Sequence, residues 1–178
     1  MLEIEKKYRL SAERSDIIAA SLQEIGAEFA GEDFEENTIY GGELLGDGSI
    51  VRIRKTDDRS LLTFKRRVEN QSDVKHQLEF ETEVSDSGAT ANMLLELGLH
   101  PRLVYEKRRR TWQFRDVEIV LDELPFGLFM EIEGSVSGIK EAEQALGIED
   151  LETEHETYPR LTGRLGRRIG EIIEARFE

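Results

Sequence analysis

Several features that define large classes of proteins are missing from this sequence of 178 residues. It contains no cysteine, which excludes disulfide bonds, a thiol nucleophile and a thiolate metal site. No apolar run approaches the roughly 20 residues that a membrane span needs. The N-terminal segment also lacks the apolar centre of a signal peptide. We therefore expect a cytoplasmic protein that has no membrane partner.

Positive charge is also scarce, because 38 Asp and Glu residues oppose 24 Lys and Arg residues and give a formal net charge of −14. A general nucleic-acid-binding protein needs a positive surface, so we expect no nucleic-acid partner. A small anionic ligand remains compatible with this charge, since grouped cations can focus a positive potential within a cleft. The cations are grouped at Arg52 and Arg54, at residues 65–67 and at residues 107–110.

The alternation of polar and apolar residues predicts a chain of mostly β-strands with four helices. The expected strands cover residues 2–8, 34–40, 49–55, 61–68, 77–84, 104–114, 117–122 and 128–134. The expected helices cover residues 11–26, 88–97, 137–146 and 158–178, with Ser11 and Ser137 as N-caps of the first and third. Neither a repeat nor a linker divides the chain, so we expect one domain over residues 1–178.

The predicted strands carry charges that are sorted by sign. Glu3, Glu5 and Lys7 share one face of the first strand, because successive side chains point to opposite faces. Any single strand of this kind is explained by a sheet with one face in water. A solvated face normally mixes its signs, however, so the set favours a sheet curved around its charged face. The further rows are Arg52/Arg54, Lys65/Arg67, Lys107/Arg109, Glu79/Glu81/Glu83 and Glu131/Glu133.

A buried charged face requires ligands that offset its charges, because isolated buried charges cost too much free energy. A divalent cation would neutralise the carboxylates, and phosphate groups would neutralise the Arg and Lys side chains. No nucleophile elbow and no Gly-rich phosphate loop offers another basis for phosphate chemistry. The alternation therefore predicts a metal–polyphosphate site in a central passage, with helices covering the outer apolar face.

Segments along nearly the whole chain resemble, in the same order, the CYTH superfamily, also called triphosphate tunnel metalloenzymes. That family includes class IV adenylyl cyclases, thiamine triphosphatases and inorganic tripolyphosphatases. The first segment, Glu3-Ile4-Glu5-Lys6-Lys7, matches the E-x-E-x-K signature of the family. The other matching segments are residues 51–54, 62–65, 79–83, 105–109, 120–123, 129–133 and 157–158.

The resemblance implies an α+β fold, an eight-stranded antiparallel β-barrel that forms a triphosphate tunnel and is flanked by helices. It also implies Mg²⁺ or Mn²⁺ as the cofactor. The phosphates would be held by Lys7, Arg52, Arg54, Lys65, Lys107 and Arg109. The metal would be held by Asp122, Glu131 and Glu133, with Glu3 and Glu5 at a second metal or its waters. Lys7, Glu3 and Glu5 would act in catalysis, and Glu79 and Glu81 would be further acidic residues of the tunnel.

The resemblance leaves more than one activity open. We favour metal-dependent hydrolysis of inorganic tripolyphosphate, thiamine triphosphate or a nucleoside triphosphate such as ATP. A class IV adenylyl cyclase, which makes cyclic AMP and pyrophosphate, would also need a pocket for the base, and no motif indicates one. A non-catalytic polyphosphate or nucleotide binder and an acidic interaction domain are the remaining alternatives. We expect a monomer or a homodimer, and we assign none of His76, His100 and His155 to catalysis.

Overall fold

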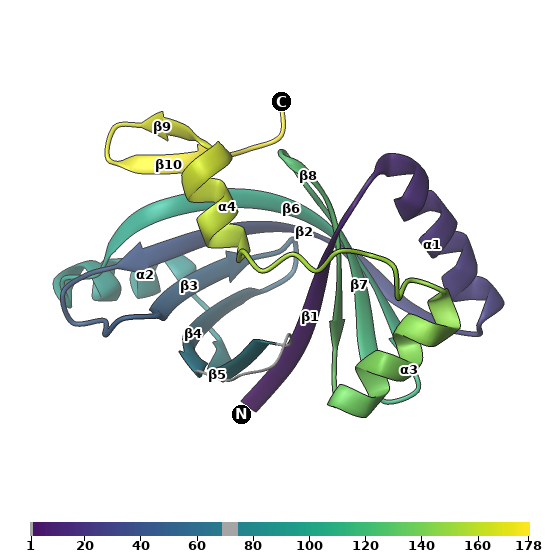
Figure 1. Ribbon diagram of the computed structural model, residues 1–178. Helices are drawn as coiled ribbons and strands as arrows, with labels where there is room; N and C mark the ends of the chain where they lie inside the picture. Colours follow the sequence, from purple (N-terminus) through teal and green to yellow (C-terminus); the bar gives the residue numbers. More distant parts are fainter. Residues whose placement is uncertain (1, 69–74) are drawn as a thin grey trace.

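Eight antiparallel strands form a ring in which each strand pairs with two neighbours. The computed structural model describes residues 2–68 and 75–178 (Figure 1). The strands are β1 (Leu2–Leu10), β2 (Glu28–Gly41), β3 (Ser49–Lys55), β4 (Ser60–Val68), β5 (Lys75–Glu83), β6 (His100–Phe114), β7 (Val117–Leu124) and β8 (Gly127–Glu133). They follow the order β2-β3-β4-β5-β1-β8-β7-β6, and a further pairing of β6 with β2 joins the two ends of this series. The predicted eight-stranded antiparallel barrel is confirmed.

Most strands cover the predicted residues, because their alternation is strong enough to define them locally. Among the strands, the observed boundary differs most from the predicted one in β2, which begins at Glu28 rather than at residue 34. The early part of β2 pairs with β6, with a register shift between Phe29 and Gly31. Such a pairing depends on a strand far away in the sequence, so a local pattern does not predict it. The predicted polar loop over residues 69–73 lies outside the described residues.

Four helices accompany the barrel: α1 (Ala12–Glu24), α2 (Ser87–Glu96), α3 (Val136–Leu146) and α4 (Tyr158–Leu165). The Ser11 hydroxyl caps α1 as predicted and accepts a hydrogen bond from the backbone N–H of Arg14 at 3.1 Å. The predicted cap of α3, Ser137, is wrong. Ser135 is the N-cap and accepts from the N–H of Gly138 at 3.0 Å. No helix in the described part of the chain has the length and apolar character to span a membrane.

The prediction of one helix from residue 158 to the C-terminus is also wrong. After α4 the chain forms two short antiparallel strands, β9 (Arg167–Ile169) and β10 (Ile172–Ala175), and β10 pairs in parallel with β6. A Cβ atom at Gly166 would lie 2.6 Å from the carbonyl oxygen of Thr162, so glycine is needed where the helix ends. Gly170 lies in the turn of the hairpin with a φ of +62°, which favours glycine.

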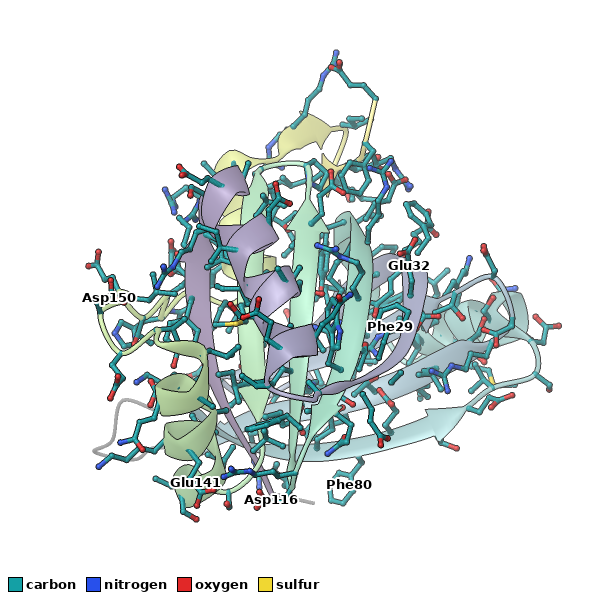
Figure 2. All side chains as sticks on the ribbon, turned by 90° about the vertical axis from the view of Figure 1, so that its right-hand side faces the viewer. Phe29, Glu32, Phe80, Asp116, Glu141 and Asp150 are labelled. Carbon is teal, nitrogen blue, oxygen red and sulfur yellow. The ribbon has the colours of Figure 1, made fainter. Side chains whose placement is uncertain are left out.

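The main hydrophobic core lies between the outward face of the sheet and the pair α1 and α3. Figure 2 shows both helices lying over the strands, with Glu141 of α3 and Asp150 after it pointing into solvent. Ile18 and Leu22 of α1 are buried in this cluster together with Trp112 and Phe114 of β6. The prediction that these two aromatic residues lie on the outward face under a helix is confirmed. Full burial of such side chains contributes about 1.5–3 kcal/mol each.

Two smaller apolar clusters complete the structure around the barrel. One joins α4 and β10 to the strands through Tyr105, Phe129, Tyr158, Leu161 and Ala175. The other lies under α2 and consists of Tyr40, Val51, Ile53, Leu94 and Leu99. The first cluster holds the N-terminal turn of α4 against the interior of the barrel. It therefore brings a late segment of the chain to the charged residues of the strands.

Candidate active site

The inward faces of the strands border a cavity of about 380 Å³. Lys7 of β1, Arg54 of β3, Lys107 of β6 and Glu131 of β8 all line it, because alternation turns every second side chain inward. The predicted site residues in the lining are Glu5, Lys7, Arg52, Arg54, Lys65, Glu79, Glu81, Lys107, Arg109, Glu131 and Glu133. The backbone of Glu3 lies in β1, but its side chain is outside the described part of the chain.

Lys7 is held in the cavity by three neighbours and is only 2% exposed. Its ammonium nitrogen Nζ lies 3.1 Å from Oε1 of Glu131 and 3.7 Å from the centroid of the Tyr158 ring. It also donates a hydrogen bond of 3.4 Å to the carbonyl oxygen of Glu156. Burial lowers the pKa of Lys7, but Glu131 and Glu5 raise it to a greater extent, so its pKa is above the ordinary value. Lys7 therefore stays charged at neutral pH.

Asp122 lies behind the lining of the cavity and is 1% exposed. Arg109 donates to both of its carboxylate oxygens, from Nε at 2.7 Å and from Nη2 at 2.6 Å. The hydroxyl of Tyr158 donates to Oδ2 of Asp122 at 2.8 Å, and Nζ of Lys107 lies 3.5 Å from the same oxygen. Arg109 also donates to Oε2 of Glu131 at 2.7 Å. Asp122 thus orients two cations and a tyrosine toward the cavity.

Glu35 of β2 is a buried carboxylate that the sequence analysis did not identify as part of the site. Its Oε2 atom lies 3.2 Å from Nζ of Lys107 and 3.6 Å from Nε of Arg54, and it accepts a hydrogen bond of 3.1 Å from Asn37. Burial raises the pKa of Glu35, but Lys107, Arg54 and Arg109 lower it well below the ordinary value. Because β2 alternates, the row of Glu35 and Asn37 could have been recognised as inward-facing.

The cationic side of the cavity is charge-balanced by further carboxylates. Arg52 donates to the hydroxyl of Thr63 at 3.3 Å and lies 3.5 Å from Oε2 of Glu81. Thr63 in turn donates to the same oxygen at 2.7 Å. Lys65 forms an ion pair with Glu79. Burial and the neighbouring Arg109 lower the pKa of Lys107 to about 8. The site therefore presents its cations on a framework of fixed carboxylates.

Three carboxylates of the lining lie side by side on adjacent strands. Glu133 of β8 is paired in register with Glu5 of β1 on one side and with Glu118 of β7 on the other. Burial raises the pKa of Glu133 to about 7; Lys65 opposes this shift, whereas Glu5 and Glu118 add to it. The sequence analysis did not identify Glu118 as a site residue, although it shares one face of its strand with Asp122. Adjacent like charges are unfavourable unless a cation offsets them.

This acidic row has the donor chemistry that a divalent metal ion requires. Mg²⁺ and Mn²⁺ prefer carboxylate oxygens, and a divalent charge would offset the burial and the neighbouring carboxylates that raise the pKa of Glu133. Among the side chains that the structure describes, which exclude those of residues 1–3 and 67–77, no three His, Asp or Glu residues stand close enough together to hold a metal ion. The cavity therefore suits a metal ion in the type of its donor atoms and in its charge. The carboxylates that would hold the ion are those of Glu5, Glu118, Glu131 and Glu133.

The connection between α3 and α4 forms part of the cavity wall. It crosses in front of β1 (Figure 1), and its residue Glu154 donates a backbone hydrogen bond of 2.7 Å to the carbonyl oxygen of Lys7. His155 and Thr157 from this connection line the cavity, as does Arg160 from the first turn of α4. His155, which the sequence analysis did not assign to catalysis, is exposed and also borders the site.

Comparison with known proteins identifies the family of this chain and structures that share its fold. The model of the CYTH domain matches residues 1–159. "Putative adenylate cyclase MJ0240" of Methanocaldococcus jannaschii is 24% identical over 151 residues, which cover 82% of this chain and 84% of that protein. The solved PH1012 protein of Pyrococcus horikoshii is 25% identical with a TM-score of 0.78, over 89% of this chain and 98% of that one. HpAC1 of Hippeastrum is 17% identical with a TM-score of 0.68, over 96% and 99% of the two chains. Since the family model spans most of its residues, this chain belongs to the CYTH family.

Proposed function

We propose that this protein is a divalent-metal-dependent triphosphatase that hydrolyses the terminal phosphate of a triphosphate bound in the barrel cavity. The observation that carries the proposal is that the lining combines a row of carboxylates with a set of seven cations. The carboxylates of the row are Glu5, Glu118 and Glu133. Binding of an anion alone would need only the cations, whereas a metal-bound triphosphate needs both groups.

The cations would bind and orient the phosphate oxygens. Arg52 and Arg54 offer forked N–H donors to these oxygens, while Lys65 and Lys107 act as compact positive charges. Arg109 donates from Nε and Nη2 to Asp122 and Glu131, so its Nη1 group would be the one that binds phosphate. The pKa of Lys7 is raised, so Lys7 would remain an ammonium and would bind a phosphate oxygen rather than remove a proton. Positioning and charge neutralisation of this kind supply most of the catalysis in phosphoryl transfer.

In the hydrolysis itself, the oxygen of a water molecule would form a bond to the terminal phosphorus. The bond from that phosphorus to the bridging oxygen would break, and the remaining diphosphate would leave with the bonding electron pair. The proton that the attacking water loses would pass to the phosphate oxygens of the products. Glu5, next to Lys7 in the lining, would accept a hydrogen bond from the attacking water and so orient it. Mg²⁺ or Mn²⁺, held by Glu118, Glu131 and Glu133 with Glu5, would supply charge stabilisation at the phosphates.

Adenylate cyclase activity is the second candidate, because the curated relative from Methanocaldococcus jannaschii carries that name. HpAC1 from Hippeastrum is itself described as having a dominant triphosphatase activity, which supports the hydrolase proposal for this fold. An adenine base would have to contact the apolar part of the lining. Ile50, Pro159 and two largely buried tyrosines, Tyr105 and Tyr158, are its apolar or aromatic members.

The direct test is to measure orthophosphate, pyrophosphate and cyclic AMP together. Tripolyphosphate, thiamine triphosphate and ATP would each be supplied with Mg²⁺ or Mn²⁺ and, in parallel, with a chelator. We expect orthophosphate that disappears with the chelator and with the variant Glu131→Gln. Cyclic AMP with pyrophosphate from ATP would instead establish the cyclase. Tight triphosphate binding without any product would contradict catalysis and favour a binding protein.

A further inference from the structure

Arg160 is the cation of the cavity wall that the proposed chemistry does not use. It lies in the first turn of α4, lines the cavity and is exposed to solvent. Its backbone N–H donates a hydrogen bond of 3.4 Å to the hydroxyl of Thr157, the N-cap of the helix. The apolar contacts of α4 with the strands fix the backbone at this point. The position of Arg160 at the edge of the cavity is therefore set by the fold.

Arg160 differs from the other cations of the lining in its electrostatic partners. In the part of the chain that the structure describes, it is the one Arg or Lys of the lining whose side chain has neither an ion-pair nor a hydrogen-bond partner. One helical turn further along α4, Arg164 lies 2.6 Å from Oε2 of Glu156. The ion pairs of the other lining cations are Lys7–Glu131, Arg52–Glu81, Arg54–Glu35, Lys65–Glu79, Lys107–Glu35 and Arg109–Asp122.

The surroundings of Arg160 favour an anion over an organic group. His155 and Thr157, which precede Arg160 closely in the chain, are polar residues of the same lining. The two nearby acidic residues of the connection are already paired, Glu154 with Arg9 at 3.3 Å and Glu156 with Arg164. Their negative charge is thus offset, and the positive charge of Arg160 is available to a ligand.

We propose that Arg160, with His155 and Thr157, forms an outer phosphate subsite of the cavity. The subsite would bind the fourth phosphate of a linear inorganic polyphosphate whose other three phosphates occupy the ion-paired cations. This inference rests on the proposed function and deepens it, because it makes chains longer than three phosphates the better ligands. The forked guanidinium of an Arg suits a phosphate oxygen pair at such a position.

The test is equilibrium binding of tripolyphosphate and tetrapolyphosphate, measured by isothermal titration calorimetry with a chelator present so that the ligands stay intact. We expect the wild-type protein to bind tetrapolyphosphate about fivefold more tightly than tripolyphosphate, which is the effect of a partly exposed ion pair. Arg160→Ala should remove this preference and leave tripolyphosphate binding unchanged. Arg164→Ala is the matched control on the same helix and should preserve the preference. Circular dichroism would verify that both variants are folded.

Several outcomes would overturn the outer subsite. One is equal affinity of the wild-type protein for tripolyphosphate and tetrapolyphosphate. Another is an Arg160→Ala variant that retains the preference for tetrapolyphosphate, or that binds both ligands more weakly by the same factor. Hydrolysis is measured separately, with metal present. Tight binding with the expected chain-length preference but without hydrolysis would refute the triphosphatase proposal alone. Hydrolysis without the preference would refute the subsite alone.

Discussion

The ammonium of Lys7 lies 3.7 Å from the centroid of the Tyr158 ring, so the first strand and α4 contact each other inside the cavity. The hydroxyl of the same tyrosine donates to Asp122, which in turn binds Arg109 through both of its oxygens. Tyr158 is buried and has a raised pKa, because burial and then Asp122 and Glu131 disfavour its ionised form. One neutral ring therefore positions cations that come from two different strands.

Substitution of Tyr158 separates the role of its ring from that of its hydroxyl. Tyr158→Phe removes the hydrogen bond to Asp122 and should lower the free energy of unfolding by about 1–2 kcal/mol, while Lys7 keeps its contact with the ring. Tyr158→Leu also removes the cation–π contact and should lower kcat/KM for triphosphate by about tenfold. Equal kcat/KM values in the two variants would show that the ring does not hold Lys7.

Glu35 should be required for stability because it is buried between two cations. Glu35→Gln leaves Lys107 and Arg54 without their shared carboxylate, and breaking a buried ion pair typically costs about 3–5 kcal/mol. We expect a loss in that range in urea unfolding. Glu36→Gln is the matched control, because Glu36 is the next residue and its ion pairs with Lys55 and Arg176 are partly exposed. If the two variants are equally stable, the buried network does not stabilise the fold.

The raised pKa of Glu133 predicts how stability depends on pH when a chelator is present. Its pKa in the folded protein, about 7, exceeds the ordinary value of 4.5, so the folded state binds this proton more tightly than the unfolded state. The free energy of unfolding should therefore fall as the pH rises from about 4.5 to about 7, and then level off. Allowing for the partial exposure of the side chain, we expect a contribution of about 1–2 kcal/mol.

The check compares wild-type protein with Glu133→Gln in urea unfolding at pH 5, 6, 7 and 8. Glutamine cannot ionise, so the variant should show a correspondingly smaller fall in stability over this range. Parallel curves for the two proteins would mean that folding does not raise the pKa of Glu133.

The core under α1 offers a test of the fold that is independent of the site. Leu22 is fully buried against the outward face of the sheet, whereas Ile17 on the same helix is 48% exposed. Leu22→Ala should cost about 2–5 kcal/mol of unfolding free energy, the usual effect of a truncated core residue. Ile17→Ala should cost well under that value. If the two variants lose similar amounts of unfolding free energy, α1 does not bury the face that contains Leu22.

Much of the barrel is predictable from the sequence because the signal is local. In β3, for example, the alternation of Arg52 and Arg54 with their apolar neighbours defines both the boundaries of the strand and its inward face. The same reasoning correctly predicts that Trp112 and Phe114 face outward into the core. The inward faces in turn indicate most of the residues that line the cavity.

The remaining features depend on contacts between distant segments. The strand β10 exists because it pairs with β6, and the glycines that weaken a helix there do not specify a strand partner. Glu35 becomes a site residue only because the register of β2 and β6 places it opposite Lys107. Arg160 reaches the cavity wall through the packing of Leu161 and Tyr158. The spacing of these two residues indicates a buried helix face, but it does not indicate which strands that face covers.

The contact of Lys7 with residues near α4 also has a consequence for how the protein folds. The hydrogen bond from Lys7 to Glu156 joins residues that are 149 positions apart, and β1 can find its two partner strands only after both have been made. Contacts of such high sequence separation slow folding, since a long loop must close before they form. The cavity should thus be among the last parts of the molecule to assemble, and a chain that ends before residue 156 should lack an ordered binding site even if most of its strands have formed.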